Sequence, residues 1–235
     1  MIIALTGFMG CGKSSVGRRL SELLCCPFMD LDEVIVESAG RTVPEIFASD
    51  GEAEFRRMEH EALHYVIGQF PMCSRGPLPL RGPLPLAGGG KMPLPHNRQP
   101  ALDQKWHNSD SIHQADAPYE QGSQQAKSLG EISAVLALGG GTVMTPECAE
   151  MVREHTLCVY LRASVDTLVS HLEGESSGRP MLQGNLRQRI EDLMAIRSST
   201  YEKAAHVIID TDGKSIETVA REIYRISNQR DRKTL

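Results

Sequence analysis

The sequence predicts an α/β protein with a five-stranded parallel sheet and helices on both faces. Five short apolar runs, each about as long as a buried strand, alternate with segments of helical periodicity. The first run, residues 2–5, leads through a glycine-rich loop into a helical segment. The apolar residues at helical spacing in that segment are Val16, Leu20, Leu23 and Leu24. With 235 residues, the chain is long enough for one domain with a sizeable core.

The glycine-rich loop, residues 7–14, reads GFMGCGKS and has the form G-x-x-x-x-G-K-S. Such a loop binds phosphate because backbone N–H groups of the loop and of the following helix point at phosphate oxygens. We expect Lys13 to reach the β- and γ-phosphates and the Ser14 hydroxyl to hold Mg²⁺. The pattern therefore predicts a nucleoside triphosphate ligand. The residues expected to bind it are Gly10, Cys11, Gly12, Lys13, Ser14 and Ser15.

The next elements follow in order before residue 71. Residues 28–32 read as the second strand. Thr42 and Glu45 form a capping box with Pro44 in the first turn, which predicts a short helix. Residues 50–51 are predicted as a turn before a longer helix. The buried face of that helix is expected to comprise Phe55, Met58, Ala62, Val66 and Phe70.

The second half of the chain continues the alternation. The remaining strands are predicted at residues 134–138, 157–161 and 207–210. Helices are expected to begin at Thr145 and Pro146, at Ser164 and at Ser215.

Residues 71–130 interrupt the globular pattern. They contain nine of the thirteen prolines, and the hexapeptide RGPLPL occurs at 75–80 and again at 81–86. A segment of this composition buries too little apolar surface to order a core, so we predict a disordered, low-complexity insertion within a single domain spanning 1–235. Because the insertion precedes the strand at 134–138, we expect it at the edge of the sheet opposite the ligand.

Composition narrows the partners and the compartment. The net charge of −5 argues against nucleic acid. No apolar stretch approaches the roughly 18 to 20 residues that span a bilayer, so we expect a cytoplasmic protein without a membrane partner. The six scattered cysteines are expected to be reduced thiols. His60 and His64 lie four residues apart without further ligands nearby, so we expect no metal there.

Cys11 lies inside the phosphate loop, where a helix N-terminus can lower the pKa of a thiol. The alternative is a small side chain whose backbone N–H does the binding, and we favour that interpretation.

The carboxylates for phosphoryl transfer are expected to come from the second strand, because the strand at 134–138 ends in glycine. Asp30 and Asp32 end the second strand, and residues two apart in an extended segment face the same side. One could serve the metal while the other takes a substrate proton. The alternative is that one of them caps the following helix.

Taken together, these motifs resemble those of shikimate kinases in kind and order. They are the phosphate loop, FMDLD at 28–32, GEAEFRRME at 51–59, the triple glycine at 139–141, Arg179-Pro180, and Arg197 four residues before Tyr201. The resemblance covers nearly all of the chain except the insertion. It implies a three-layer P-loop kinase fold, similar to nucleoside monophosphate kinases, and a transferase that phosphorylates the 3-hydroxyl of shikimate with MgATP in aromatic amino-acid biosynthesis.

The resemblance also implies roles for the acidic residues and for the loop lysine. Asp30 is assigned with Ser14 to the magnesium shell, and Asp32 to the substrate hydroxyls as the base. Lys13 is expected to act in catalysis together with Asp32.

The substrate carboxylate is assigned by the resemblance to Arg56 and Arg197. A guanidinium group suits a carboxylate because it can donate two parallel hydrogen bonds. Glu59 matches the residue that orients Arg56, whereas Arg57 is expected to be solvated. Backbone without side chains is expected to approach the substrate at Gly139, Gly140 and Gly141. A plain tight turn is the alternative for these glycines.

The polar segment at 173–183 resembles the family's lid, in which Arg179 would contact ATP and bring positive charge to the transferring phosphoryl group. The chain departs from the family pattern at Leu172, where a second lid arginine is common. Two other functions remain open: another small-molecule kinase such as a gluconate kinase, or a nucleotide-binding module that docks through the proline-rich insertion. The resemblance suggests a monomer.

Overall fold

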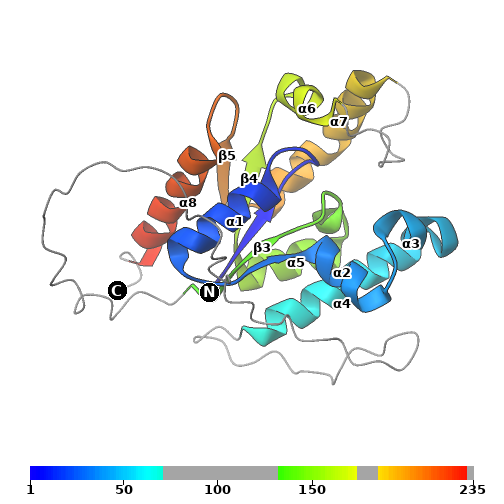
Figure 1. Cartoon of the computed structure of the whole chain (residues 1–235), viewed down its shortest axis with the longest axis horizontal. Coiled ribbons are helices and arrows are strands. Elements are labelled where there is room, and N and C mark those ends of the chain that lie inside the picture. Colours follow the sequence, from blue (N-terminus) through cyan, green and yellow to red (C-terminus); the bar gives the residue numbers. More distant parts are fainter. Residues whose placement is uncertain (71–131, 174–184, 232–235) are drawn as a thin grey trace, which may run out of the picture.

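The structure, a computed structural model, describes residues 1–70, 132–173 and 185–231 (Figure 1). The predicted insertion at 71–130 lies outside the described residues. So does the predicted lid at 173–183 apart from its first residue, and with it Arg179. The single domain over 1–235 therefore stays a prediction.

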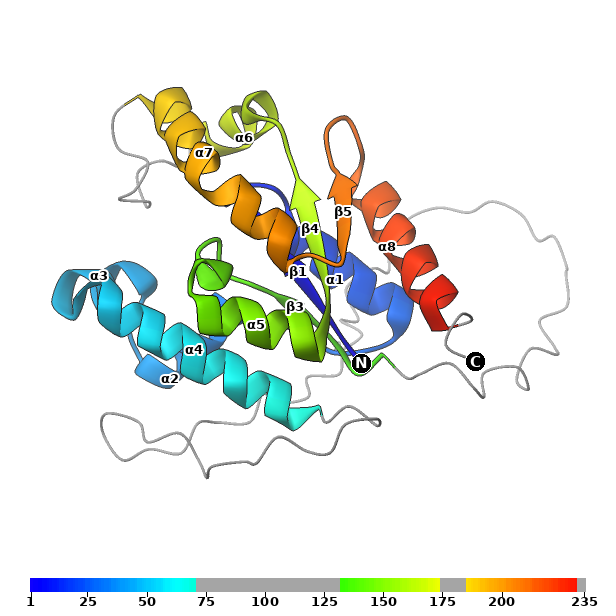
Figure 2. The same cartoon turned by 180° about the vertical axis from the view of Figure 1, so that it is seen from behind.

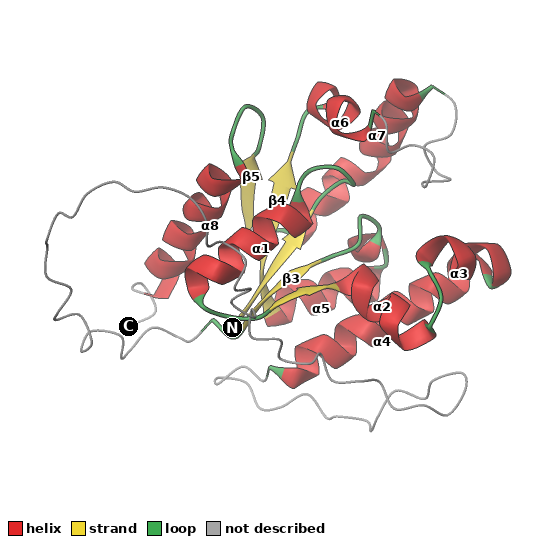
Figure 3. Ribbon diagram, viewed as in Figure 1, coloured by secondary structure: helices red, strands yellow, loops and turns green. Residues whose placement is uncertain are grey.

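The described residues form a five-stranded sheet in which every pair of neighbouring strands is parallel (Figure 3). The strands are β1 (Ile2–Thr6), β2 (Phe28–Asp30), β3 (Ala134–Ala137), β4 (Thr156–Arg162) and β5 (Val207–Asp210). Their order is β2-β3-β1-β4-β5, so the central strand β1 pairs with β3 on one side and with β4 on the other. The predicted five-stranded parallel sheet is thus confirmed.

Helices cover both faces of this sheet. They are α1 (Lys13–Leu24), α2 (Leu31–Ala39), α3 (Val43–Ser49), α4 (Gly51–Gln69), α5 (Pro146–His155), α6 (Val165–Leu172), α7 (Leu186–Ala204), α8 (Ile216–Asp231) and the 3₁₀ helix η1 (Thr142–Met144). In Figure 1, α1 and α8 lie in front of the sheet, whereas Figure 2 shows α5 and α7 over the opposite face. Helices α2, α3 and α4 pack together beside the sheet.

The predicted helix starts depend on local capping, and three of them are made by side chains. Thr42 and Glu45 form the reciprocal capping box that begins α3. The Ser164 hydroxyl accepts the N–H of Thr167 at the start of α6. At the start of α8, the Ser215 hydroxyl accepts the N–H of Thr218. These hydrogen bonds satisfy N–H groups that have no partner within the helix.

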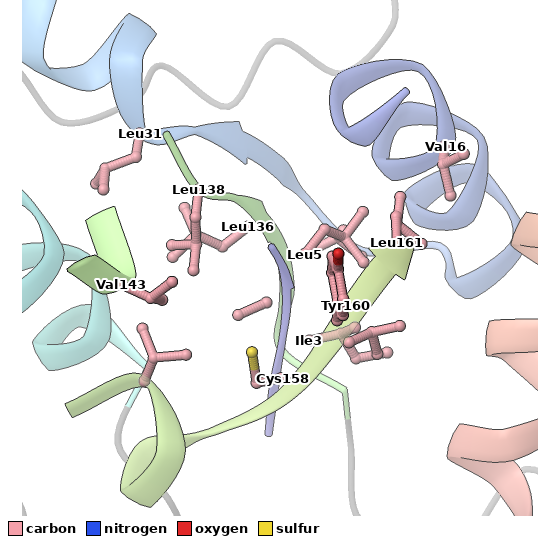
Figure 4. Packing of buried hydrophobic residues seen from close by; sticks show 14 of the residues in the cluster. Ile3, Leu5, Val16, Leu31, Leu136, Leu138, Val143, Cys158, Tyr160 and Leu161 are labelled. Carbon is pink, nitrogen blue, oxygen red and sulfur yellow. The ribbon is translucent and has the colours of Figure 1, made fainter. Parts of the chain in front are cut away.

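The core lies on both faces of the sheet, between the strands and the helices (Figure 4). Every residue of β1 and β3 is buried, as is expected of strands covered on two sides. In α4, Phe55, Ala62 and Val66 are buried as predicted, whereas Met58 and Phe70 are only half-buried. The helix also buries Glu59, Leu63 and Ile67, which widens its inner face beyond the predicted stripe. No helix within residues 1–70, 132–173 and 185–231 is long and apolar enough to cross a membrane.

Candidate active site

The phosphate loop joins the carboxyl end of β1 to the first turn of α1, as the sequence predicts. Gly12 caps α1 with a φ of 90°, in the left-handed region that suits glycine. The Lys13 ammonium donates hydrogen bonds to the carbonyl oxygens of Gly7 at 2.8 Å and Phe8 at 3.0 Å. Its charge is therefore held over the loop. Ser15 is exposed at the start of α1.

The side chain of Cys11, within the phosphate loop, is packed into the core. Its thiol is buried, and burial raises the pKa of Cys11 although the charge of Lys13 opposes the shift. This favours the interpretation as a small, unreactive side chain. Five cysteines lie within the described residues, and all five are free thiols: Cys11, Cys25, Cys26, Cys148 and Cys158.

The Asp30 carboxylate connects the end of β2 to the first turn of α1. Its Oδ2 accepts the Ser14 hydroxyl at 2.7 Å, and its Oδ1 accepts the backbone N–H of Asp32 at 3.1 Å. Asp30 is thus the N-cap of α2. Ser14 and Asp30 together offer two adjacent oxygen donors, which fits Mg²⁺ because that ion takes few protein ligands and keeps water and phosphate oxygens. Within the part of the chain described, no three His, Cys, Asp or Glu residues are grouped to hold a metal by themselves.

Asp32 does not lie in an extended strand, and that prediction was wrong. Because Asp30 caps the following helix, β2 ends there and Asp32 falls in the first turn of α2. Burial raises the pKa of Asp32 to about 6, with a further contribution from Asp30 and Glu59. Its Oδ1 is buried and has no hydrogen-bond partner among the described residues. The helical placement therefore still leaves an unpaired carboxylate oxygen beside Gly139.

Residues 139–141 form the turn that brings these groups together, here called the glycine turn. A Cβ added to Gly139 would lie 2.8 Å from Asp32 Oδ1, and one added to Gly141 would lie 2.8 Å from the guanidinium carbon of Arg56. Gly140 borders the phosphate loop, since a Cβ there would lie 3.5 Å from the Met9 amide nitrogen. None of the three glycines has a positive φ. Close approach of other groups, and not a strained turn, accounts for them.

Arg56 is held in place by Glu59, as expected. Its guanidinium donates to Glu59 Oε2 and, at 3.0 Å, to Glu52 Oε1. The Thr142 hydroxyl donates to the other Glu59 oxygen at 2.8 Å. Thr142 was not foreseen, although a polar residue directly after the glycines was a signal for it. Arg57 is exposed, as expected, and its ion pairs with described residues, Glu54 and Glu61, lie within its own helix.

Arg197, the second predicted carboxylate-binding arginine, lies on α7. It is buried and lies near Tyr201, one helical turn further on, whose hydroxyl donates to the Gly140 carbonyl. Burial raises the pKa of Tyr201, while the charge and the hydrogen bond of Arg197 act in the opposite direction. Asp32 and Arg56 therefore border the glycine turn, and Arg197 lies one helical turn from Tyr201, which is hydrogen-bonded to the glycine turn.

The end of α6 contacts the phosphate loop at Gly10. His171 Nδ1 lies 2.8 Å from the Gly10 carbonyl oxygen, and a Cβ at Gly10 would lie 2.9 Å from Leu172 Cγ. Leu172 is fully buried there. The residue that departs from the family pattern thus packs against the loop, a contact that no local sequence pattern predicts.

Comparisons with known proteins identify the family of this chain. The family model described as Shikimate kinase matches residues 9–72 and 120–227. The chain is similar to the shikimate kinase of Thermus thermophilus, with 31% identity over 222 residues, 94% of this chain and 86% of the relative. It is also similar to that of Geobacter sulfurreducens, with 32% identity over 223 residues, 94% and 87% of the two chains. A solved structure of shikimate kinase from Acinetobacter baumannii in complex with shikimate aligns with a TM-score of 0.65 and 26% identity, covering 96% of this chain and 91% of that one. The chain belongs to the shikimate kinase family.

Proposed function

We propose that this protein transfers the γ-phosphoryl group of ATP to the 3-hydroxyl of shikimate, which gives shikimate 3-phosphate and ADP. The observation that supports this most directly is the meeting of Asp32 and Arg56 on the glycine turn, whose middle residue borders the phosphate loop. The proposed base for a hydroxyl and the proposed guanidinium for a carboxylate thus meet on a turn that borders the phosphate loop. A gluconate kinase would have no evident need for a second arginine on the same turn.

On the nucleotide side, Lys13 and the N–H groups of residues 10–15 bind the phosphates of ATP. The Lys13 ammonium exchanges its two carbonyl partners for phosphate oxygens. Ser14 and Asp30 would hold Mg²⁺, which would neutralise part of the phosphate charge of ATP. Arg179, from the predicted lid at 173–183, adds positive charge at the transferring group.

On the acceptor side, Arg56 and Arg197 bind the carboxylate of shikimate, and backbone of the glycine turn approaches its ring. Asp32 accepts the proton of the 3-hydroxyl while that oxygen forms a bond to the γ-phosphorus and the bond from phosphorus to the β-γ bridging oxygen breaks. A pKa of about 6 leaves Asp32 ionised at neutral pH yet more basic than an ordinary aspartate. We further propose a cytoplasmic monomer without a nucleic-acid or membrane partner.

An ADP-release assay with shikimate, gluconate or no acceptor tests this function. We expect turnover with shikimate only, and ³¹P NMR should detect one new phosphate monoester. Turnover with gluconate alone would overturn the substrate assignment. Tight ATP binding without turnover on any acceptor would favour a nucleotide-binding module.

A further inference from the structure

Tyr201 has contacts that the proposed reaction does not explain. It is fully buried on α7, its ring centroid lies 5.2 Å from that of Tyr160, and its hydroxyl donates to the Gly140 carbonyl. Burial, the ring contact and the hydrogen bond together hold the phenol of Tyr201 in place. Buried hydroxyl groups of this kind cost stability unless they are hydrogen-bonded, so the position of the acceptor matters.

The direction of the hydrogen bonds around this phenol is fixed by its chemistry. A phenol has one hydrogen to donate, and Tyr201 gives it to Gly140. Arg197 has only donors, so once Tyr201 has given its hydrogen to Gly140, its oxygen can meet the guanidinium only as an acceptor. The two residues are four apart on one helix, where side chains are neighbours. Tyr201 can therefore accept from the Arg197 guanidinium while it donates to the Gly140 carbonyl.

The hydrogen bond of Tyr201 ends at Gly140, the middle residue of the glycine turn. Gly139 on one side approaches Asp32, and Gly141 on the other side approaches Arg56. The hydrogen bond from Tyr201 to Gly140 therefore ties the helical turn that carries Arg197 to the same short piece of backbone as the other two groups. Hydrogen bonds linked through one hydroxyl polarise and strengthen one another in a poorly solvated environment.

We propose that Tyr201 is a positioning residue for the acceptor: its hydroxyl sets the Arg197 guanidinium against the glycine turn, so that Arg197 and Arg56 grip one carboxylate. This rests on the proposed function. Tyr201 does not touch the reacting atoms, and its effect appears in the binding of shikimate and not in that of ATP.

The variant Tyr201→Phe keeps the ring and removes only the hydroxyl. We expect the KM for shikimate to rise about tenfold or more, the loss of a hydrogen bond to a charged group, with the KM for ATP and kcat changed less than about threefold. Tyr160→Phe is the matched control, because it removes a neighbouring buried hydroxyl that makes no bond to the glycine turn; its KM for shikimate should stay within about twofold of wild type. An equal rise in both KM values for Tyr201→Phe, or an equal effect of both variants, would contradict a positioning role.

A double-mutant cycle with Arg197→Met separates positioning from packing. If Tyr201 acts through Arg197, Tyr201→Phe should raise the shikimate KM by less than about twofold once Arg197 is already replaced, whereas additive effects would overturn the inference. Should Tyr201→Phe fail to fold, 3-fluorotyrosine at position 201 keeps ring and hydroxyl but weakens the oxygen as an acceptor. A smaller rise in the shikimate KM is then expected, and an unchanged KM would also refute it. Wild-type enzyme that does not phosphorylate shikimate would sink the proposed function instead, so the two failures are distinguishable.

Discussion

The Ser14 hydroxyl donates a 2.7 Å hydrogen bond to Asp30, which ties the first turn of α1 to the carboxyl end of β2. The same carboxylate caps α2 through its other oxygen. One aspartate thus fixes the proposed metal-binding pair and the start of the helix that carries Asp32. The two roles can be separated by substitution.

Asp30→Asn should weaken the use of Mg²⁺ while the fold is preserved. The amide oxygen of asparagine still caps a helix, whereas the negative charge that attracts the cation is lost. We expect the Mg²⁺ concentration for half-maximal turnover to rise on the order of tenfold, with little change in melting temperature. A Mg²⁺ titration at saturating ATP and shikimate measures this. Glu33→Gln, which removes an exposed carboxylate from α2, is the control, and an equal response of both variants would refute a metal role for Asp30.

Asp32 should control the acid side of the pH profile. As the proposed base it works only when ionised, and its pKa is raised to about 6. We therefore expect kcat/KM for shikimate to fall tenfold per pH unit below about pH 6 and to level off above it. Asp32→Asn should lower kcat by about 10²- to 10⁴-fold and abolish this limb. A variant that keeps the limb would show that another group titrates.

The raised pKa of Asp32 also predicts that stability falls with rising pH, whereas activity rises. The pKa of Asp32 is higher in the folded protein than its ordinary value of 3.8, so folding favours the protonated form. The free energy of unfolding should therefore fall as pH rises from about 4 to about 6. At neutral pH, where Asp32 is ionised, we expect the folded protein to be destabilised by roughly 3 kcal/mol. Asp32→Asn should melt at a higher temperature than wild type at pH 7.5, with the difference vanishing near pH 4. Equal melting temperatures at pH 7.5 would mean that the carboxylate is better solvated than its burial indicates.

Arg56→Lys should separate guanidinium recognition from charge. Lysine keeps the positive charge beside buried Glu59 but cannot donate two parallel hydrogen bonds to a carboxylate. We expect the KM for shikimate to rise about 10- to 100-fold, with the KM for ATP near normal. Arg57→Lys is the control, because Arg57 is an exposed neighbour whose ion pairs on α4 contribute little. Equal losses for both substrates would show that Arg56 does not bind the acceptor.

His171→Leu should act on the nucleotide instead. Because the Gly10 carbonyl accepts from His171, removing the imidazole frees a peptide of the phosphate loop to reorient. We expect the KM for ATP to rise about fivefold with the KM for shikimate unchanged, the loss of one neutral hydrogen bond. His171→Asn, whose amide N–H can occupy the place of Nδ1–H, should restore most of the affinity. Equal KM values for ATP in the two variants would contradict the hydrogen-bond explanation.

How far the sequence predicts this site depends on whether a contact has a local signature. The phosphate loop, the two aspartates and Arg56 stand in short patterns, and the structure brings them to the phosphate loop and the glycine turn. The boundary at Asp30 was misjudged because a strand end and a helix cap use the same residue type. The contacts of Thr142 with Glu59 and of His171 with Gly10 join residues 83 and 161 positions apart, so only the packed fold reveals them.

Removing residues 75–127 should leave the reaction largely intact. Phe70 ends α4 fourteen residues beyond Arg56, about 21 Å along the helix axis at 1.5 Å per residue. Ser133, just before β3, donates to the Met1 carbonyl at the amino end of the sheet, whereas the phosphate loop and the glycine turn follow the carboxyl ends. The chain therefore leaves and rejoins the described fold away from the site. We expect kcat and both KM values of the shortened protein within about threefold of wild type, since stability depends only weakly on loop length. A soluble, folded deletion variant without activity would assign the segment a role in the reaction.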